Sequence, residues 1–334
     1  MTALHVQPTA PRGPDGADPA LDEPRRIIAR PTPQDRVFRG LAGGVGLFAL
    51  VIVGTTAIFL FIKGKPALDS TGWLSFFRTS IWNPSTGTFG VYGLLVGTVL
   101  IATVALAIAM PIALATAIFV NEYAPIRLRR FLVGAIDLLA AMPSLIFGLW
   151  GVFALEKHLV GPAGWTGRHL SAIPIFRLSS SDPSLARSGF VAGCVVALMI
   201  IPIVTSVSRD VMSQVPRDLV EGALALGGTR WGAVRDVILP FGRSGIIGAA
   251  LLGFGRALGE TIAVALVISI VTEPNWNVLE TGGGTIAGFI ATQFGEANEQ
   301  ALSGLIAAGL ALFIMTLVVN GFARRVVRRT SRFT

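Results

Sequence analysis

Charged side chains are scarce in this chain. Aspartate, glutamate, lysine and arginine make up 14% of the 334 residues, whereas hydrophobic residues make up 52%. Soluble domains average about 25% charged residues, so the composition excludes an ordinary soluble protein. It predicts an integral membrane protein.

Residues that bind metals or form covalent links are equally few. The one cysteine, Cys194, lies in an apolar run, so no disulfide can form within the chain. The three histidines, His5, His158 and His169, lack neighbours typical of a metal site. With no nucleophile–base pair or metal cluster in the sequence, we expect neither catalytic nor metal-binding residues, which argues against a membrane-embedded enzyme.

A phosphate-binding loop for ATP is also missing. The sequence contains no G-x-x-x-x-G-K-[ST] pattern, and the one Gly64-Lys65 pair is followed by Pro66. We therefore expect no cofactor in this chain. If ATP drives its function, ATP and Mg are bound by a partner protein.

Long apolar runs dominate the rest of the sequence. A membrane-spanning helix needs about 20 residues. Six runs are long enough, and Pro111 and Pro143 predict kinks in two of them. The runs are Leu41–Ile62, Val91–Val120, Phe131–Leu155, Gly189–Val207, Ser244–Val271 and Ala301–Phe322. They predict an all-α integral membrane fold with six transmembrane helices.

The two ends of the chain differ from this pattern. Residues 1–36 hold seven prolines and mixed charge, which predicts a disordered cytoplasmic tail rather than a cleaved signal. We expect a six-helix domain over residues 37–325 and a basic cytoplasmic tail over residues 326–334.

Lysine and arginine predict the orientation. Arginines are concentrated in both tails and in two of the gaps between apolar runs, residues 121–130 (the second gap) and 208–243 (the fourth gap). Residues 272–300 contain no lysine or arginine. The positive-inside rule then places both termini in the cytoplasm of a multi-pass protein. The net charge of +8 is explained by this topology and by anionic lipid, so we expect no nucleic-acid partner.

The fourth gap, residues 208–243, is long and contains EGALALGGTRWGAVRDVILP. It predicts two short amphipathic helices that are joined at Gly227-Gly228, where glycine permits a sharp turn. Pro240 is expected to stop the second helix at the membrane surface. By physical chemistry alone, a helix pair lying on the lipid headgroups explains this stretch equally well.

The same stretch resembles the EAA loop of ABC-importer permeases. Gly222 and Val237 replace the loop's first alanine and its isoleucine; the matching positions are Glu221, Ala223, Gly227, Leu239 and Pro240. The resemblance implies a type I ABC importer permease fold. It also implies that this loop is a coupling helix that docks on a cytoplasmic ATPase.

Two charges stand in the fifth apolar run. Arg256 and Glu260 are four residues apart, so on one helix they share a face and are able to pair. A charge at mid-membrane costs about 2.5–3.5 kcal/mol, which favours a functional role facing a water-filled cavity over a structural ion pair. The planar fork of arginine suits an oxyanion.

The stretch RALGET resembles the phosphate-specific ABC permeases of the Pst system. Ile262 and Ala263 follow Thr261, where the partner subunit usually reads G-E-T-A-P, and this favours the C-type subunit. The resemblance extends over about residues 34–325, including MPSLIFGLWG around Ser144. It implies that Arg256, Glu260, Thr261 and Ser144 line the substrate pathway.

By this resemblance, the chain is expected to be one permease half of an ATP-driven phosphate importer in a prokaryotic plasma (inner) membrane. Its expected partners are a homologous permease subunit in a heterodimer, two ATPase subunits and an extracytoplasmic phosphate-binding protein. R-A-L-G-E also occurs in sulfate and molybdate permeases, which remain an alternative. A secondary anion transporter is a further alternative, although it does not need an EAA loop.

Overall fold

The computed structural model describes residues 32–178 and 185–330, and it divides into two units, residues 1–55 and 56–334. The described part of the first unit is the start of helix α1 (Pro33–Thr71), whose side chains are nearly all exposed there. The Asp35 carboxylate accepts the Thr32 N–H at 2.9 Å, and the Thr32 hydroxyl accepts the Asp35 N–H at 3.3 Å. This reciprocal cap starts the helix inside the tail predicted over 1–36, most of which lies outside the described residues.

The prediction of six spans is confirmed. Within the described residues, six helices are long and apolar enough to cross a membrane. They are Pro33–Thr71, Tyr92–Tyr123, Ser144–His169, Gly189–Ser213, Arg230–Leu258 and Glu299–Val327.

The six spans are built from α-helices and short π-helical turns. They consist of α1; α3 (Tyr92–Ile118) with η2 (Phe119–Tyr123); α5 (Ser144–Trp150), η3 (Gly151–Leu155) and α6 (Glu156–His169); α7 (Gly189–Ser213); α9 (Arg230–Ala233), η5 (Val234–Ile238) and α10 (Leu239–Leu258); and α13 (Glu299–Thr330). The shorter elements between them are α2 (Trp73–Arg78), β1 (Trp82–Asn83), β2 (Thr88–Phe89), α4 (Ile126–Ala140), η4 (Pro174–Phe176), α8 (Arg217–Ala225), α11 (Ile262–Val267), α12 (Ile286–Gln293) and η6 (Phe294–Glu296).

The third predicted span, Phe131–Leu155, is wrong in its bounds. Helix α4 ends at Ala140, and a new helix begins at Ser144 after Pro143, which has an extended backbone (φ −61°, ψ 140°). Proline disfavours helical geometry in the residue before it, so the chain breaks here instead of bending. The spanning helix is therefore Ser144–His169, and α4 is a separate amphipathic helix.

The expected stop at Pro240 is also wrong. Helix α10 begins at Leu239 and carries Pro240 in its first turn, in one continuous helical run that starts at Arg230. The preceding turn is π-helical, and the Leu239 N–H donates to the Val234 carbonyl. Proline is tolerated here because the regular i→i−4 hydrogen-bond pattern is already interrupted by the π-helical turn.

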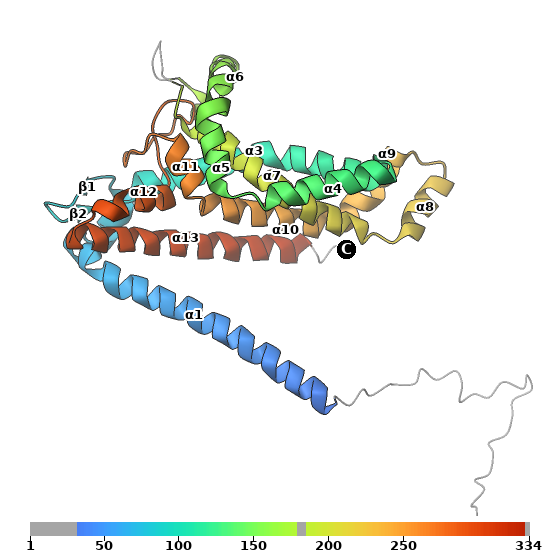
Figure 1. Cartoon of the computed structure of the whole chain (residues 1–334), viewed down its shortest axis with the longest axis horizontal. Coiled ribbons are helices and arrows are strands. Elements are labelled where there is room, and N and C mark those ends of the chain that lie inside the picture. Colours follow the sequence, from blue (N-terminus) through green and yellow to red (C-terminus); the bar gives the residue numbers. More distant parts are fainter. Residues whose placement is uncertain (1–31, 179–184, 331–334) are drawn as a thin grey trace, which may run out of the picture. The chain divides into compact units, whose positions relative to one another are not determined.

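Helices α3, α7 and α10 form the centre of the second unit and run side by side in Figure 1. Glycines allow the helices to approach closely. A Cβ at Gly193 of α7 would lie 2.6 Å from Val104 Cγ1 of α3, and one at Gly253 of α10 would lie 2.6 Å from Val204 Cγ2 of α7. Close approach at small residues is typical of packing between membrane helices.

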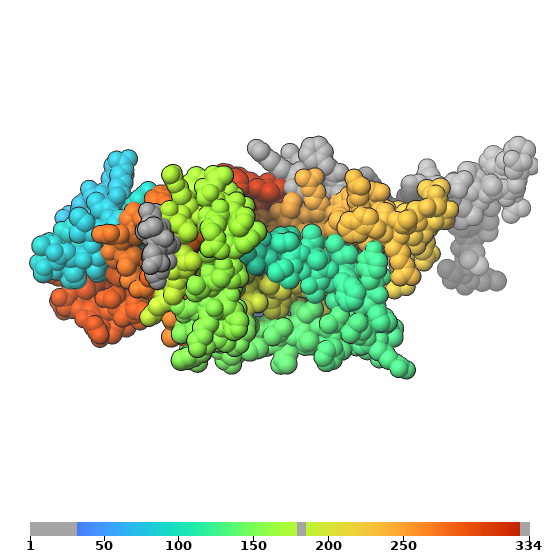
Figure 2. Space-filling model, turned by 90° about the horizontal axis from the view of Figure 1, so that it is seen from above, coloured from blue at the N-terminus to red at the C-terminus, as the bar shows by residue number. Residues whose placement is uncertain are grey.

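The loops gather at two opposite ends of this bundle. Helices α8 and α9 lie at one end, and α12 with strands β1 and β2 lies at the other (Figure 1). Seen from above, the gold surface around α8 projects from its end of the bundle (Figure 2). The arginine-rich fourth gap and the loop over 272–300 are therefore separated by the length of the spans.

Candidate functional site

The fifth span breaks inside the RALGET stretch. Helix α10 ends at Leu258, and α11 begins at Ile262, so Gly259, Glu260 and Thr261 form a non-helical link. The side chain of Glu260 is buried (7% exposed), and its Oε1 accepts the N–H of Ala263 at 3.2 Å. Its carboxylate therefore satisfies a free N–H at the start of α11, as capping groups do.

Arg256 points elsewhere. Its side chain is exposed, and it lines a pocket of about 450 Å³ between α10 and α13 together with Thr316 and Asn320. Glu260 and Thr261 are not among the described residues that line this pocket. The Thr261 hydroxyl instead donates to the Gly259 carbonyl at 3.1 Å.

The expected pairing of Arg256 with Glu260 is therefore wrong. The ion pairs among the described residues are Lys65–Asp69, Arg209–Asp210 and Arg235–Asp236. The two residues do not share one helix face, because the helix ends between them at Gly259. Among the described residues, the guanidinium of Arg256 therefore faces the pocket without a carboxylate partner.

Ser144 lies at a second break of the same kind. It is half-buried and is the first residue of α5, directly after Pro143. Helix α5 packs tightly on α11, since a Cβ at Gly148 would lie 2.9 Å from Ala263 Cα. Ser144 lies four residues before Gly148 on α5, and Glu260 lies three residues before Ala263 in the link to α11. The structure thus brings Ser144 and Glu260 to neighbouring elements, although Ser144 does not line the Arg256 pocket.

The stretch over residues 208–243, which we predicted to be a coupling loop, turns at its two glycines as expected from the sequence. Gly227 has φ +85°, its N–H donates to the Leu224 carbonyl at 3.0 Å, and the Gly228 N–H donates to the Ala223 carbonyl at 3.1 Å. These two bonds are the Schellman motif, which ends a helix with a left-handed residue. A Cβ at Gly228 would lie 2.6 Å from the Ala223 oxygen, so the turn requires glycine at this position as well.

Helix α8 is an exposed element with apolar side chains on its surface. It has no buried residue, and both of its leucines and the leucine at its C-cap are exposed. The most exposed is Leu226 at the C-cap (91%), followed by Leu219 (50%) and Leu224 (39%). Glu221 is exposed on the same helix, whereas Leu239 and Pro240 continue into the span, at the start of α10.

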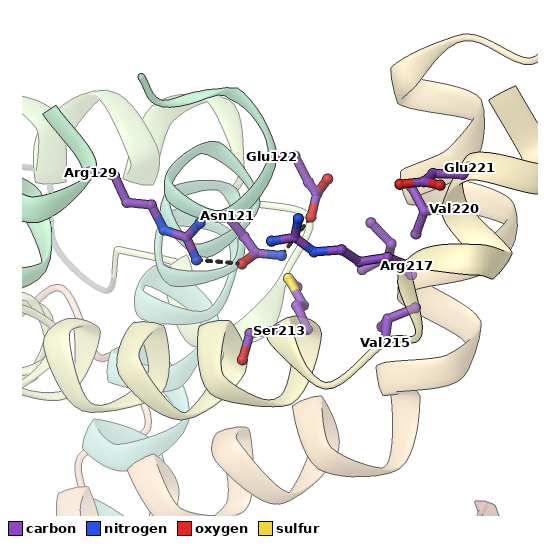
Figure 3. Close-up of a pocket in the computed structure, with 10 residues that line it drawn as sticks. Asn121, Glu122, Arg129, Ser213, Val215, Arg217, Val220 and Glu221 are labelled. Carbon is purple, nitrogen blue, oxygen red and sulfur yellow. Dashed lines mark hydrogen bonds between the residues drawn. The ribbon is translucent and has the colours of Figure 1, made fainter. Parts of the chain in front are cut away.

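Glu221 also lines a pocket of about 320 Å³ beside the coupling loop (Figure 3). Arg129 of α4 donates to the Asn121 side chain at 3.2 Å, and the Asn121 amide donates to the Glu122 carboxylate. In Figure 3 the side chain of Arg217 extends from α8 toward Asn121 and Glu122. The pocket thus joins the loop to the end of the second span and to α4 by polar groups of both signs.

Several of these residues were missed by sequence reasoning. Gly228 was seen only as part of a flexible pair, and its close contact with Ala223 depends on the folded turn. Asn320 carried a readable signal, because it is an amide inside the apolar run Ala301–Phe322. The polar group around Asn121 had no such signal, since its members come from separate elements.

Residues 109–332 match the model of a protein family described as "Binding-protein-dependent transport system inner membrane component". The chain belongs to this family. Among its relatives is "Phosphate transport system permease protein PstC 2" of Mycobacterium tuberculosis, 41% identical over 298 residues, which are 87% of this chain and 91% of the relative. "Phosphate transport system permease protein PstC" of Xylella fastidiosa (strain Temecula1) is 39% identical over 301 residues, which are 89% of this chain and 92% of the relative.

Solved structures of bacterial ABC importers share the fold. A bacterial alginate ABC transporter in complex with an alginate pentasaccharide-bound periplasmic protein aligns with a TM-score of 0.59 at 15% identity, over 89% of this chain and 95% of that one. The MetNI methionine ABC transporter aligns with a TM-score of 0.51 at 18% identity, over 72% of this chain and 95% of that one. The predicted ABC-importer permease fold is confirmed, and the chain is a membrane transport subunit and not an enzyme.

Proposed function

We propose that this chain is one permease half of an ATP-driven importer of inorganic phosphate. The observation that carries the proposal is Arg256, whose guanidinium lines a pocket between α10 and α13 and has no carboxylate partner among the residues that the structure describes. An anion that leaves water for a membrane cavity loses hydration, and a fixed cation offsets part of that loss. The relatives named as phosphate permeases support phosphate as the anion.

Ser144 and Thr261 are proposed as further pathway residues. Each belongs to a link at which a spanning helix is interrupted, and interrupted helices in transporters free polar backbone groups near the solute. Glu260 acts differently from our sequence-based expectation. Its carboxylate holds the start of α11, so its contribution to transport is to fix the geometry of the link beside Arg256.

The coupling loop is proposed to dock on a separate ATPase, which binds ATP and Mg. The exposed leucines of α8 and of its C-cap support this, because large apolar side chains left exposed on a loop helix suit burial against another protein. Glu221, Ala223 and Gly227 shape the docking helix, and Leu239 and Pro240 begin α10 in the helical run that follows the turn. Movement of the ATPases is then transmitted to the span that carries Arg256, and access alternates between the two sides of the membrane.

The complete importer is proposed to contain a homologous permease subunit, two ATPase subunits and an extracytoplasmic phosphate-binding protein. We place it in the plasma (inner) membrane of a prokaryote with both termini in the cytoplasm. The arginine-rich gap with α8 and the lysine- and arginine-free loop over 272–300 lie at opposite ends of the bundle, which supports this orientation.

Co-purification and ATPase activity test the proposal. The tagged chain is expressed with its neighbouring transport components, purified and reconstituted, and its ATPase rate is measured with the binding protein and phosphate, sulfate or molybdate. We expect an ATPase to co-purify and phosphate to stimulate it. Stimulation by sulfate or molybdate alone would reassign the substrate, and transport without any ATPase would point to a secondary transporter.

A further inference from the structure

The pocket of Arg256 continues along the seam between α10 and α13. A second pocket, of about 540 Å³, shares Leu251, Leu252 and Asn320 with it and reaches Arg324. Together the two pockets form one groove, which we call the α10–α13 groove. The second pocket adds Gly248 and Val327, so the groove runs from Arg256 toward the start of α10 and the end of α13. In Figure 1 these helix ends lie on the side of the bundle that carries α8 and α9.

One face of α13 lines this groove with polar groups. Thr316, Asn320 and Arg324 are spaced four residues apart, so they form a stripe about 12 Å long on one side of the helix. The Asn320 side chain lies over α10, because a Cβ at Gly255 would be 3.9 Å from its Oδ1. The stripe therefore faces the same space as Arg256.

The charge of the groove has one sign. Its described lining contains two arginines, one asparagine and one threonine but no aspartate or glutamate. The pocket beside the coupling loop differs, because it mixes two carboxylates with two arginines. An unpaired basic groove inside an apolar bundle suits an anion.

Asn320 is an unusual residue for the surface of a membrane-spanning helix. Its side chain is not covered by other parts of this chain, and its neighbours in the sixth span are apolar. Polar side chains within spans face other protein or a water-filled cavity, because hydrocarbon offers no hydrogen-bond partner. Val318 lies about 200° away around the helix and is 65% exposed, which is the surface expected to meet lipid.

We propose that the α10–α13 groove is the inner half of the route of a tetrahedral oxyanion, with Asn320 as the next contact after Arg256 and Arg324 at the exit. This rests on the proposed function of Arg256. The amide of Asn320 donates hydrogen bonds to the anion without adding charge, so the anion is passed on rather than held. Arg324 draws it toward the cytoplasmic end.

Thiol labelling tests where the route runs. Cys194 is the chain's one cysteine and is replaced by alanine, and Gly255→Cys, which lines the Arg256 pocket, Asn320→Cys and Val318→Cys are made singly in that background. The assembled complex in nanodiscs is treated with a charged, water-soluble thiol reagent. We expect Gly255→Cys and Asn320→Cys to react, phosphate to slow both reactions severalfold relative to chloride at equal ionic strength because Arg256 is retained in both, and Val318→Cys to stay unlabelled.

The outcomes separate this inference from the proposed function. If Gly255→Cys is labelled and protected by phosphate but Asn320→Cys is not labelled, the route leaves the groove, and only the inference is overturned. If neither position is protected, both are overturned.

Uptake supplies the second measurement. Asn320→Leu keeps the side-chain size but removes the donor, and we expect at least a tenfold loss of uptake with an intact complex, whereas Val318→Leu should transport normally. Loss of the partner subunit from the Asn320→Leu complex would show instead that Asn320 is an interface residue, and the inference would fail.

Discussion

Replacement of Gly227 tests whether the turn after α8 couples the loop to transport. Gly227 has φ +85°, and open space surrounds the position of a Cβ, so a side chain fits and only the backbone conformation resists it. A left-handed conformation costs a non-glycine residue about 1–2 kcal/mol, and a β-branched residue is disfavoured further. This energy corresponds to about a 5–30-fold loss in the population of the turn.

Gly222 provides a matched control one turn earlier. It also has open space around a Cβ, but it lies inside α8 with an ordinary backbone. Alanine at this position favours the helix by about 1 kcal/mol. We therefore expect Gly222→Ala to be neutral or stabilising, whereas Gly227→Asn, Gly227→Ala and Gly227→Val should be increasingly harmful, because asparagine tolerates positive φ best.

The assay has three readings: membrane insertion, recovery of the ATPase subunits by pull-down, and phosphate uptake. For Gly227→Val we expect normal insertion, with weakened ATPase recovery and little uptake. If Gly227→Val matches Gly222→Ala in all three readings, the turn has no part in coupling and our account of the loop is refuted.

Three further replacements follow from the packing. Gly228→Ala should weaken ATPase recovery as Gly227→Val does, because the added Cβ would lie 2.6 Å from the Ala223 oxygen. Normal recovery would show that the turn does not require glycine at this position. Gly148→Val should lower the free energy of unfolding by about 1–3 kcal/mol through overpacking against Ala263, which lowers the melting temperature. An unchanged melting temperature would contradict the contact between α5 and α11. Glu260→Gln retains an oxygen for the Ala263 N–H and should keep assembly and much of the uptake. Glu260→Ala removes this oxygen and should lower the free energy of unfolding by about 1 kcal/mol. Equal stability of the two variants would argue against the cap.

The apolar runs were sufficient to predict the class of fold. Membrane spans are set by length and hydropathy, so the number of spans and the position of the coupling loop could be predicted from the sequence. The Gly227 turn was also predictable, because positive φ strongly favours glycine.

The helix breaks were not predictable in the same way. Apolar residues continue through Pro143 and through Gly259, and hydropathy does not distinguish a continuous helix from two short ones. Because the helix breaks at Gly259, the Glu260 carboxylate accepts the Ala263 N–H of α11, and Arg256 forms no ion pair with it. Sequence spacing alone suggested the opposite, an ion pair on one face.

Phosphate uptake by the reconstituted complex carrying Arg256→Ala is the most direct test of the proposed transport route. The account predicts that this complex assembles with all its subunits but has lost ATP-driven uptake, and that Arg256→Lys restores little because the planar fork is absent. Uptake at the wild-type rate by Arg256→Ala, or loss of the partner subunits from it, would contradict the role of Arg256 as the anion contact.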